Sequence, residues 1–529
     1  MATISKDPSE TAVTVDTPPI PPSQDTGFFG HPRGLSTLFF TEMWERFSYY
    51  GLRPLLVLFM TAALASGGFG FERSQASAIV GIYAASVYLA SLPGGWIADR
   101  ILGLRRAIMT GAVLITLGHL SIGLSAFAHG KVPFFLGLIL IVCGTGLLKP
   151  NIAAIVGDLY PEGGARRDAG FSVFYMGINT GAFAGQLVAG ALGENVGWHW
   201  GFGCAGVGML IGLITFAVRQ RGTLGNLGLE PSKNPDPVIQ AQQLSRAKMI
   251  LGVAVAILAA IVIAAATGVL PINPVWVAEK MTYVLVGLAV LFFGGVLVTG
   301  NLNGDEKKRL LVIFVLFIFS AIFWGAFEQA PTSLNLFARD FTDRSFFGHQ
   351  IPSTAFQSVN SAFIIIFAPI FAGVWLTMAK RGAELSSPGK FALGLIFAGI
   401  GFGLMIPAAY MILNSGGAIK VSPWWLVASY LFQTFGELCV SPVGLSSMTK
   451  LSPRKYVGQM MGIWFLATSV GNLIAGLVGG SIDPEKLEQT PQLFIWTTVA
   501  LVGSAAVLAL LAIPIRNMMK NVPVSGRAV

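Results

Sequence analysis

Charged residues are scarce in this sequence. Asp, Glu, Lys and Arg make up 11% of the 529 residues, whereas an average soluble domain has roughly 25%. Hydrophobic residues make up 54%, and the mean hydropathy is +0.70. So few charges cannot cover the surface of a soluble protein of this length. The composition therefore excludes a soluble enzyme and a disordered scaffold, and it indicates a protein that crosses a membrane many times.

Cysteine and histidine are also rare. The three cysteines, Cys143, Cys204 and Cys439, all lie in apolar segments, so a disulfide framework and a metal site are not implied. The sequence has five histidines and neither an HExxH nor a GxSxG motif. We therefore expect no catalytic residues, no metal and no organic cofactor, which makes a membrane-embedded enzyme the least favoured function.

Two further features are missing, a long basic run and a cleavable signal. The net charge is +9, yet the basic residues come mostly in pairs between apolar stretches, which argues against nucleic-acid binding and is typical of membrane topology. The first 28 residues lack the apolar core of a signal peptide. We predict a disordered tail over residues 1–30 and expect the first membrane helix to target the chain.

Apolar stretches long enough to span the hydrocarbon core, which needs about 20 residues, occur fourteen times. They predict an all-α polytopic membrane protein with transmembrane helices at 34–63, 76–97, 106–127, 133–157, 169–190, 198–218, 247–270, 275–299, 309–335, 354–378, 390–414, 422–447, 457–480 and 490–515.

The positions of the basic residues orient these helices. An even number of spans places both termini on one side of the membrane. Of the 34 Lys and Arg residues, 24 fall in the tails and loops of that side and 7 in the opposite loops. Because Lys and Arg accumulate in cytoplasmic loops, both termini are predicted to be cytoplasmic.

The chain divides into two comparable halves, which suggests an internal repeat. Its longest polar interruption between helices, residues 219–246, follows the sixth span. We predict an N-terminal six-helix bundle at 31–218, a linker with two extra membrane helices at 219–308, a C-terminal six-helix bundle at 309–515 and a cytoplasmic tail at 516–529. The extra pair carries few charges, and we expect it to have a packing role.

Charged residues inside the predicted spans are the strongest functional signal. They are Glu42, Glu45, Arg46, Arg53, Lys149, Glu328 and Glu437. A charge in the bilayer is costly unless it is paired or hydrated. A structural ion pair could explain any two of them. One water-filled cavity explains all seven with a smaller free-energy cost of burying charge.

The spacing of these charges supports a single cavity. Glu42, Glu45, Arg46, Tyr49 and Arg53 share one face of the first helix, and Glu42 and Arg46 are i, i+4 partners spaced for direct pairing. The first-half site is basic and the second-half site is acidic. A cavity that is positive at one end and negative at the other suits a zwitterion such as a peptide.

Aromatic and amide residues in the spans are candidates for the rest of this cavity. The aromatic candidates are Tyr49, Tyr50, Tyr88, Phe174, Trp324 and Trp464, each of which taken alone is more simply a packing or lipid-facing residue. Asn179 and Asn360 could bond a peptide backbone, and hydrogen bonds between helices are the alternative.

Several segments together resemble the proton-dependent oligopeptide transporter (POT/PTR) family of the major facilitator superfamily, prokaryotic type. Residues 42–51, EMWERFSYYG, are similar to its ExxERFxYYG signature. Further matches in the family's order are GTGLLKPN at 144–151, FYMGINTGA at 174–182, FWGAFEQ at 323–329 and GELCVSPVGLSSMTKLSP at 436–453. The segment from Gly95 to Arg106 is similar to the superfamily's gating loop.

The resemblance implies a fold and site roles, which are carried over to matching positions. The implied fold is two six-helix bundles with two extra central helices. The implied proton-coupling residues are Glu42, Glu45, Arg46, Lys149 and Glu328. The implied substrate-binding residues are Arg53 and Lys149 for the peptide carboxylate, Glu437 for the amino terminus, and Tyr49, Tyr50, Tyr88, Asn179, Trp324, Asn360, Trp464 and Thr468 around them. The implied gating residues are Asp99, Arg100, Arg105 and Arg106. The chain departs from some members at Phe327, where a second acid is absent, and at Thr468, where certain relatives have Ser.

The resemblance and the charges together predict a monomeric symporter in the cell inner membrane that imports di- and tripeptides with protons. Protonation of a carboxylate would release a paired cation, which could then bind the peptide carboxylate. Alternating access would arise as the two bundles rock around the site. The nearest alternative is another small substrate on the same fold, such as nitrate, an amino-acid-like compound or a drug.

Overall fold

The computed structural model describes residues 25–519 apart from 129, 233–235, 347 and 384. Most of both predicted tails, residues 1–24 and 520–529, lies outside the described residues. The prediction of disorder is wrong for residues 25–30. There the Asp25 carboxylate accepts hydrogen bonds from the backbone N–H groups of Gly27 at 3.0 Å and Arg33 at 2.9 Å, which closes a turn before the first helix.

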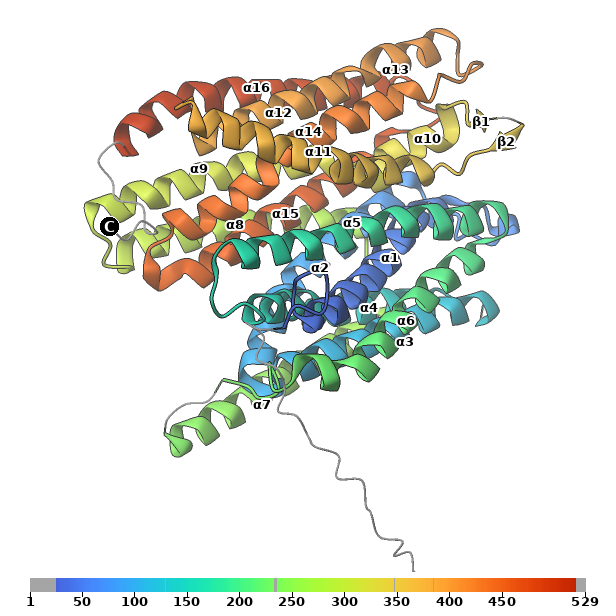
Figure 1. Cartoon of the computed structure of the whole chain (residues 1–529). Helices are drawn as coiled ribbons and strands as arrows, with labels where there is room; N and C mark the ends of the chain where they lie inside the picture. The colour runs from blue at the N-terminus through green and yellow to red at the C-terminus, as the bar shows by residue number, and fades with distance from the viewer. Residues whose placement is uncertain (1–24, 129, 233–235, 347, 384, 520–529) are drawn as a thin grey trace, which may run out of the picture.

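The described chain is helical almost throughout, and a single short hairpin is assigned within it (Figure 1). The helices are α1 (Arg33–Thr61), α2 (Arg73–Ile97), α3 (Leu104–Ala128), α4 (Lys131–Asp158), α5 (Gly164–Asn195), α6 (Trp198–Leu224), α7 (Pro237–Ala266), α8 (Pro274–Thr299), α9 (Gly304–Phe327), α10 (Asn335–Phe341), α11 (Ala355–Lys380), α12 (Ser387–Gly403), α13 (Met405–Asn414), α14 (Trp424–Leu451), α15 (Val457–Val478) and α16 (Gln489–Met519). Short turns η1 (Leu64–Ser66), η2 (Ala98–Leu102), η3 (Ala330–Leu334), η4 (Arg454–Tyr456) and η5 (Gly479–Ser481) join some of them, and β1 (Ser345–Phe346) pairs with β2 (His349–Gln350).

The fourteen predicted spans are all found as helices. Within the described residues, 11 helical segments are long and apolar enough to cross a membrane. The other three spans correspond to α1, α5 and α14, which are 29, 32 and 28 residues long. These three carry much of the charge and amide content of the predicted site, which explains why they are less apolar. The all-α polytopic fold is confirmed.

The helices form two groups of six spans. In the first, α1 packs against α5 and α6, and α3 packs against α4; in the second, α12 packs against α14 and α16, and α9 packs against α15. Contacts of α2 with α15 and of α5 with α11 join the groups. A space between these helices would therefore be lined by both halves of the chain.

A close approach of two glycines holds the groups together at α2 and α15. A Cβ added at Gly81 would lie 2.8 Å from the carbonyl oxygen of Asn472 and 2.9 Å from the Cα of Gly476. Backbones can approach this closely only where side chains are absent. Glycine thus allows the close packing of these two helices.

The extra helices lie outside the two groups. α8 packs against α2 and α15, which belong to different groups. α7 contacts the rest of the molecule chiefly through η2 and projects at the lower left of Figure 1. Arg100 donates a 2.8 Å hydrogen bond from Nη1 to Gln243 Oε1 at this junction.

The structure corrects three local predictions. Much of the polar interruption 219–246 is helical, because α6 continues to Leu224 and the Asp236 side chain caps α7 at Pro237. Asp99 and Arg100 lie in the π-helical turn η2, and Arg105 and Arg106 lie in α3, so the predicted gating loop is mostly helix. The predicted span 309–335 breaks after Phe327 and continues through the π-helical turn η3 into α10.

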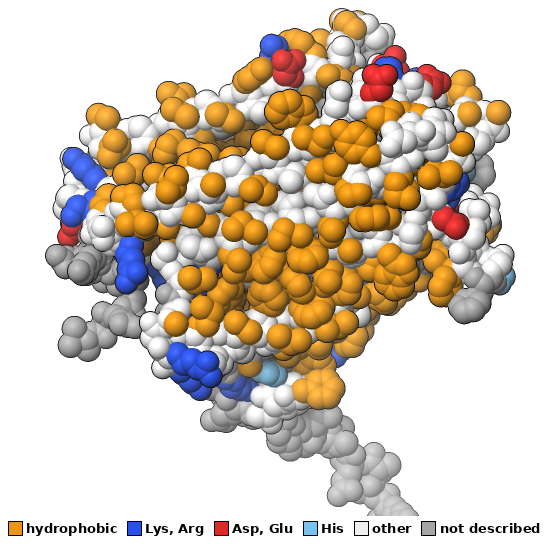
Figure 2. All heavy atoms as spheres, turned by 90° about the horizontal axis from the view of Figure 1, so that it is seen from above, with side chains coloured by type: hydrophobic (Ala, Val, Ile, Leu, Met, Phe, Trp, Pro, Cys, Tyr) orange, Lys and Arg blue, Asp and Glu red, His pale blue; other side chains and the backbone are white. Residues whose placement is uncertain are grey.

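The outer surface matches a membrane environment. Figure 2 shows hydrophobic side chains over the middle of the visible face, basic side chains at the left end, and mixed acidic and basic side chains at the right end. Large hydrophobic side chains are exposed side by side along α8, where Leu291 is 72% exposed and Val298 81%, and a contiguous apolar surface of this kind would be unfavourable in water. A lipid-facing belt accounts for them.

Candidate functional site

A cavity of about 250 Å³ lies between the two groups of helices. Residues of both halves line it, as the distribution of membrane charges predicted. Eleven of the predicted site residues are part of its wall: Glu42, Arg46, Tyr50, Arg53, Tyr88, Lys149, Asn179, Trp324, Glu328, Asn360 and Glu437. Six of the seven membrane charges therefore line one cavity, and only Glu45 departs from the expectation that all seven do.

Four predicted site residues lie behind this wall. Glu45 and Tyr49 are 1% and 3% exposed on α1. The Trp464 ring lies 6.5 Å from the Trp324 ring, centroid to centroid, so Trp464 supports a wall residue. The Thr468 hydroxyl donates a 3.3 Å hydrogen bond to the Trp464 carbonyl within α15. In this conformation these residues would act on a ligand through their neighbours.

Arg46 is held between two carboxylates on α1. Its Nε lies 3.1 Å from Glu42 Oε1, the i, i+4 partner, and it also forms an ion pair with Glu45. The Thr145 hydroxyl of α4 lies 3.4 Å from Glu45 Oε1. All three charged side chains are almost fully buried. The pairing expected from the spacing of Glu42 and Arg46 is confirmed.

This charge cluster is not fully satisfied. Among the described residues, Glu42 Oε2 and Arg46 Nη2 have no hydrogen-bond partner although both atoms are buried. Leaving such groups unpaired is costly. A proton on the Glu42 carboxylate, or a ligand bound to the Arg46 guanidinium, would therefore stabilise this cluster.

Lys149 stands apart from this cluster. Its Nζ lies 4.1 Å from the centroid of the Tyr88 ring, a cation–π contact between α4 and α2. Within the described part of the chain, Lys149 makes no ion pair. It is thus a cation of the cavity that a carboxylate ligand could pair with directly.

Arg53 has partners from the other half of the molecule. It forms an ion pair with Glu328 at the end of α9, and its Nη2 donates a 2.9 Å hydrogen bond to Asn472 Oδ1 of α15. The sequence placed Arg53 on the peptide carboxylate, yet here it links α1 to two helices of the second half. A ligand could reach this guanidinium after Glu328 or Asn472 moves.

The acidic side of the cavity is built around Glu437 on α14. Asn360 Nδ2 donates to Glu437 Oε2 at 3.3 Å and to Thr434 Oγ1 at 2.9 Å. On the opposite group of helices, Asn179 Nδ2 donates to the Tyr175 carbonyl at 3.0 Å. The Asn179 side-chain oxygen and the Glu437 carboxylate could both accept hydrogen bonds from a ligand.

Residues that the sequence argument missed complete this site. Gln186, Gln357, Gln433, Tyr175 and Tyr430 line the cavity. Asn472 binds Arg53 directly. The signal was available, because an amide inside an apolar span is the same feature that singled out Asn179 and Asn360.

Two of the predicted gating residues, Arg105 and Asp99, bind the segment that follows α6 in the first half. Arg105 donates to Gln220 Oε1 at 3.1 Å and to the Gly225 carbonyl at 2.6 Å. The Asp99 carbonyl accepts a 2.9 Å hydrogen bond from Ser232 N. Arg106, in the first turn of α3, is exposed. These contacts connect the ends of α2, α3 and α6, and their gating role stays a prediction.

Polar contacts join the two groups at the other end of the molecule. Arg73 Nη1 of α2 lies 2.6 Å from Asp340 Oδ2 of α10. The Glu194 carboxylate at the end of α5 accepts hydrogen bonds from the backbone N–H groups of Ser353 at 2.8 Å and Thr354 at 2.9 Å, just before α11. Arg344 Nη1 lies 3.3 Å from the same carboxylate. These contacts hold the two groups of helices together at this end.

Comparison with known proteins decides the family. The model of the POT family matches residues 105–491 of the chain. The chain belongs to the POT family. Among the relatives of this POT protein, "Peptide transporter YePEPT" of Yersinia enterocolitica is 50% identical over 501 residues, 93% of this chain and 96% of that protein. The "Di-/tripeptide transporter" of Lactococcus lactis is 38% identical over 84% of this chain and 89% of its own.

A solved structure shares the fold of this POT protein closely. It is described as a POT family transporter in complex with a thioalcohol conjugated peptide, and it aligns with a TM-score of 0.83 at 34% identity over 93% of this chain and 98% of its own. The family resemblance drawn from the sequence motifs is confirmed. The chain is a multi-pass membrane transporter of this family, and the membrane-embedded enzyme is excluded.

Proposed function

We propose that this POT transporter imports di- and tripeptides together with protons. The observation that carries the proposal is the cavity that has Lys149, a cation without an ion pair among the described residues, on its first-half side and the Glu437 carboxylate on its second-half side. A peptide has a carboxylate for the first side and an ammonium for the second. The names of the relatives from Yersinia and Lactococcus support the same class of substrate.

Proton coupling follows from the pairing of Arg46. A deprotonated Glu42 or Glu45 holds the guanidinium, and a proton on either weakens that hold. The guanidinium then has greater affinity for a peptide carboxylate, and by linkage a bound peptide raises the affinity for the proton. Release of both to the cytoplasm restores the ion pairs of the empty carrier.

The conformational part of the cycle rests on the contacts between the bundles. Arg53–Glu328, Arg73–Asp340 and the Glu194 contacts join the two halves on one side of the cavity. We infer that this side is extracellular and that the structure represents the state closed to the outside. Opening outward then requires these contacts to break while others form at the cytoplasmic end.

We further propose an inner-membrane location with both termini cytoplasmic and a functional monomer. The excess of Lys and Arg on the predicted cytoplasmic side supports this orientation. The basic end of the surface in Figure 2 agrees with it. A central cavity that one chain lines on all sides supports the monomer, because no second chain is needed to complete the site.

Uptake by the purified protein in liposomes tests the function. Labelled Ala-Ala and Ala-Ala-Ala should accumulate when the outside is acidic, and unlabelled peptides should compete. Alanine, nitrate and cationic drugs are the competitors that represent the alternative substrates. Stronger competition by any of these than by peptides, or peptide uptake that is independent of the pH gradient, would contradict the proposal.

A further inference from the structure

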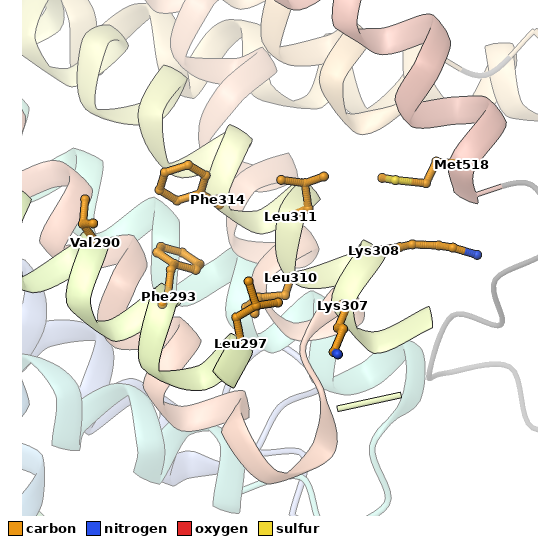
Figure 3. A pocket seen from close by; sticks show the side chains of 10 residues that line it. Val290, Phe293, Leu297, Lys307, Lys308, Leu310, Leu311, Phe314 and Met518 are labelled. Carbon is orange, nitrogen blue, oxygen red and sulfur yellow. The ribbon is translucent and has the colours of Figure 1, made fainter. Parts of the chain in front are cut away.

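A second hollow, of about 540 Å³, lies away from the central cavity between α8 and α9, with Met518 of α16 at one end (Figure 3). Its floor contains the Phe293 and Phe314 rings, whose centroids are 5.0 Å apart, and the buried Leu310. Its rim includes Val290 and Leu311, which are 54% and 51% exposed. We call this feature the α8–α9 groove.

The groove exists because α8 packs elsewhere. α8 packs mainly against α2 and α15, so only part of its other face, around Phe293, reaches α9. Gly294 contributes to the gap, since a Cβ added there would meet nothing within 4 Å. The groove opens on apolar, exposed helix surfaces that belong to the lipid-facing belt. In a bilayer an apolar hollow of this kind is accessible to acyl chains.

One end of the groove is basic. Lys307 and Lys308, in the first turns of α9, are part of its lining, and Figure 3 shows both at the end opposite Val290. With the orientation proposed above, this end faces the cytoplasm. A groove with an apolar length and a cationic cytoplasmic end complements an amphiphile whose head is negatively charged.

The acidic neighbours leave this cationic end available. Glu306 is used in a capping box, in which its carboxylate accepts a 3.0 Å hydrogen bond from Asn303 N. Asp305 pairs with Lys308 at 3.1 Å, but both side chains are more than 40% exposed and such pairs are weak. Among the described residues, Lys307 makes no ion pair.

We propose that the α8–α9 groove binds an anionic phospholipid of the cytoplasmic leaflet. One acyl chain lies on Phe293 and Phe314, and the head-group phosphate lies between Lys307 and Lys308. The lipid would fill the gap between the extra helix α8, which touches both bundles, and α9, which carries Glu328 at its end. The inference adds a lipid site to the proposed function and depends on it only for the orientation in the membrane.

Native mass spectrometry of the full-length protein with added phosphatidylglycerol or phosphatidylcholine tests the site. We expect retained phosphatidylglycerol in preference to phosphatidylcholine. The double variant Lys307→Ala/Lys308→Ala should lower that preference roughly tenfold or more, since each basic residue near the head group contributes to binding. The matched control is Arg246→Ala/Lys248→Ala, which removes two exposed charges from the cytoplasmic start of α7.

A second pair of variants separates the groove from its charges. Gly294→Leu fills the groove and should reduce retention of both lipids while the lysines remain. Gly295→Leu is the control, because its added side chain also meets open space but Gly295 does not line the groove. The proposal would be overturned if the two leucine variants had equal effects. It would also be overturned if the lysine variant kept its preference for phosphatidylglycerol, or if the α7 control lost that preference to the same extent. These measurements do not involve peptide transport. A result against the lipid site can therefore be distinguished from a result against the proposed peptide substrate.

Discussion

At the scale of single residues, the site contains two kinds of charged group: those that already have a partner of opposite charge and those that do not. Arg46 is paired with Glu42 and Glu45, and Arg53 with Glu328. Within the described residues, Lys149 has no carboxylate partner and Glu437 no cationic one. These are the two groups that we propose for the two ends of a peptide, while the two arginines would need a proton or a movement to become available.

Replacement of Glu45 by Gln should uncouple transport. Gln keeps the size of the side chain but cannot bind and release a proton, so Arg46 loses one switchable partner. We expect pH-driven dipeptide uptake to fall roughly 5- to 150-fold, the usual span of coupling energies. Counterflow of labelled against unlabelled peptide, which needs no proton cycle, should remain measurable in the same liposomes.

The matched control for this variant is Glu72→Gln, which alters an exposed carboxylate before α2. It should leave both activities unchanged. Equal loss of uptake and counterflow in Glu45→Gln would contradict the coupling role and indicate a role in folding or binding.

Replacement of Glu437 by Gln tests recognition of the peptide ammonium. Gln can still accept the hydrogen bond from Asn360, so the local structure should be preserved. The affinity for Ala-Ala should fall roughly tenfold or more, because a hydrogen bond to a charged group contributes about 1.5–3 kcal/mol. Binding of N-acetyl-Ala-Ala, which lacks the ammonium, should change little.

Competition against a labelled dipeptide measures both affinities, and Glu485→Gln on the exposed segment before α16 is the control. A parallel loss of affinity for both compounds would indicate that Glu437 shapes the cavity without contacting the amino terminus.

At the scale of the elements, the ends of helices join the two bundles on the side of the cavity that we propose to be extracellular. Glu194, near the end of α5, binds the backbone that leads into α11. This contact joins the two bundles outside the cavity. A Cβ at Gly190, one turn earlier, would lie 2.8 Å from Thr354 Cβ, so the Thr354 side chain packs directly on the backbone of α5. This latch is expected to form and break once in each transport cycle.

Replacement of Glu194 by Ala should favour the outward-open state. It leaves the N–H groups of Ser353 and Thr354 and the guanidinium of Arg344 without the carboxylate, at a cost of about 1–3 kcal/mol to the closed state. Distances between spin labels at the outer ends of α5 and α11 should then include a longer population.

The control is Glu162→Ala, which breaks an exposed pair with Arg166 near the other end of α5. It should leave the distance distribution unchanged. An unaltered distribution in Glu194→Ala would show that the latch does not hold the bundles together.

At the scale of the whole molecule, two bundles enclose one site and the extra helices stand beside them. α8 touches α2 and α15, while α7 has little contact with either bundle. The cavity walls belong to both bundles, so a relative movement of the bundles changes the access to the site without rebuilding either of them. Imported protons would make the whole cycle carry positive charge inward.

A membrane potential should therefore drive uptake. For a neutral dipeptide carried with one proton, 100 mV negative inside provides about 2.3 kcal/mol, or roughly 50-fold accumulation. Liposomes with a potassium gradient and valinomycin supply this potential at equal pH on both sides. Uptake that is unaffected or slowed by a negative interior would contradict net inward movement of charge.

The sequence by itself determined that the protein lies in a membrane, where its spans are and which charges lie inside them. These properties depend on residue type and on spacing along one helix. The pairing of Glu42 with Arg46 is such a case, since i, i+4 neighbours meet wherever the helix lies. The break after Phe327 was missed, because a run of apolar residues does not distinguish a continuous helix from one with a π-turn. The helical form of residues 98–102 was missed for another reason, since the charges of Asp99 and Arg100 ended the predicted span and the segment was assigned to a loop.

Only the tertiary structure decided which charges meet across the bundles. Arg53 binds Glu328, which is 275 positions away, and Asn472, which is 419 positions away. Likewise, Trp324 reaches the cavity and Trp464 lies behind it, although both are aromatic residues in apolar spans. Periodicity fixes the face of a helix on which a side chain lies. The partner of that face depends on how the two bundles dock, which is a property of their packing as a whole.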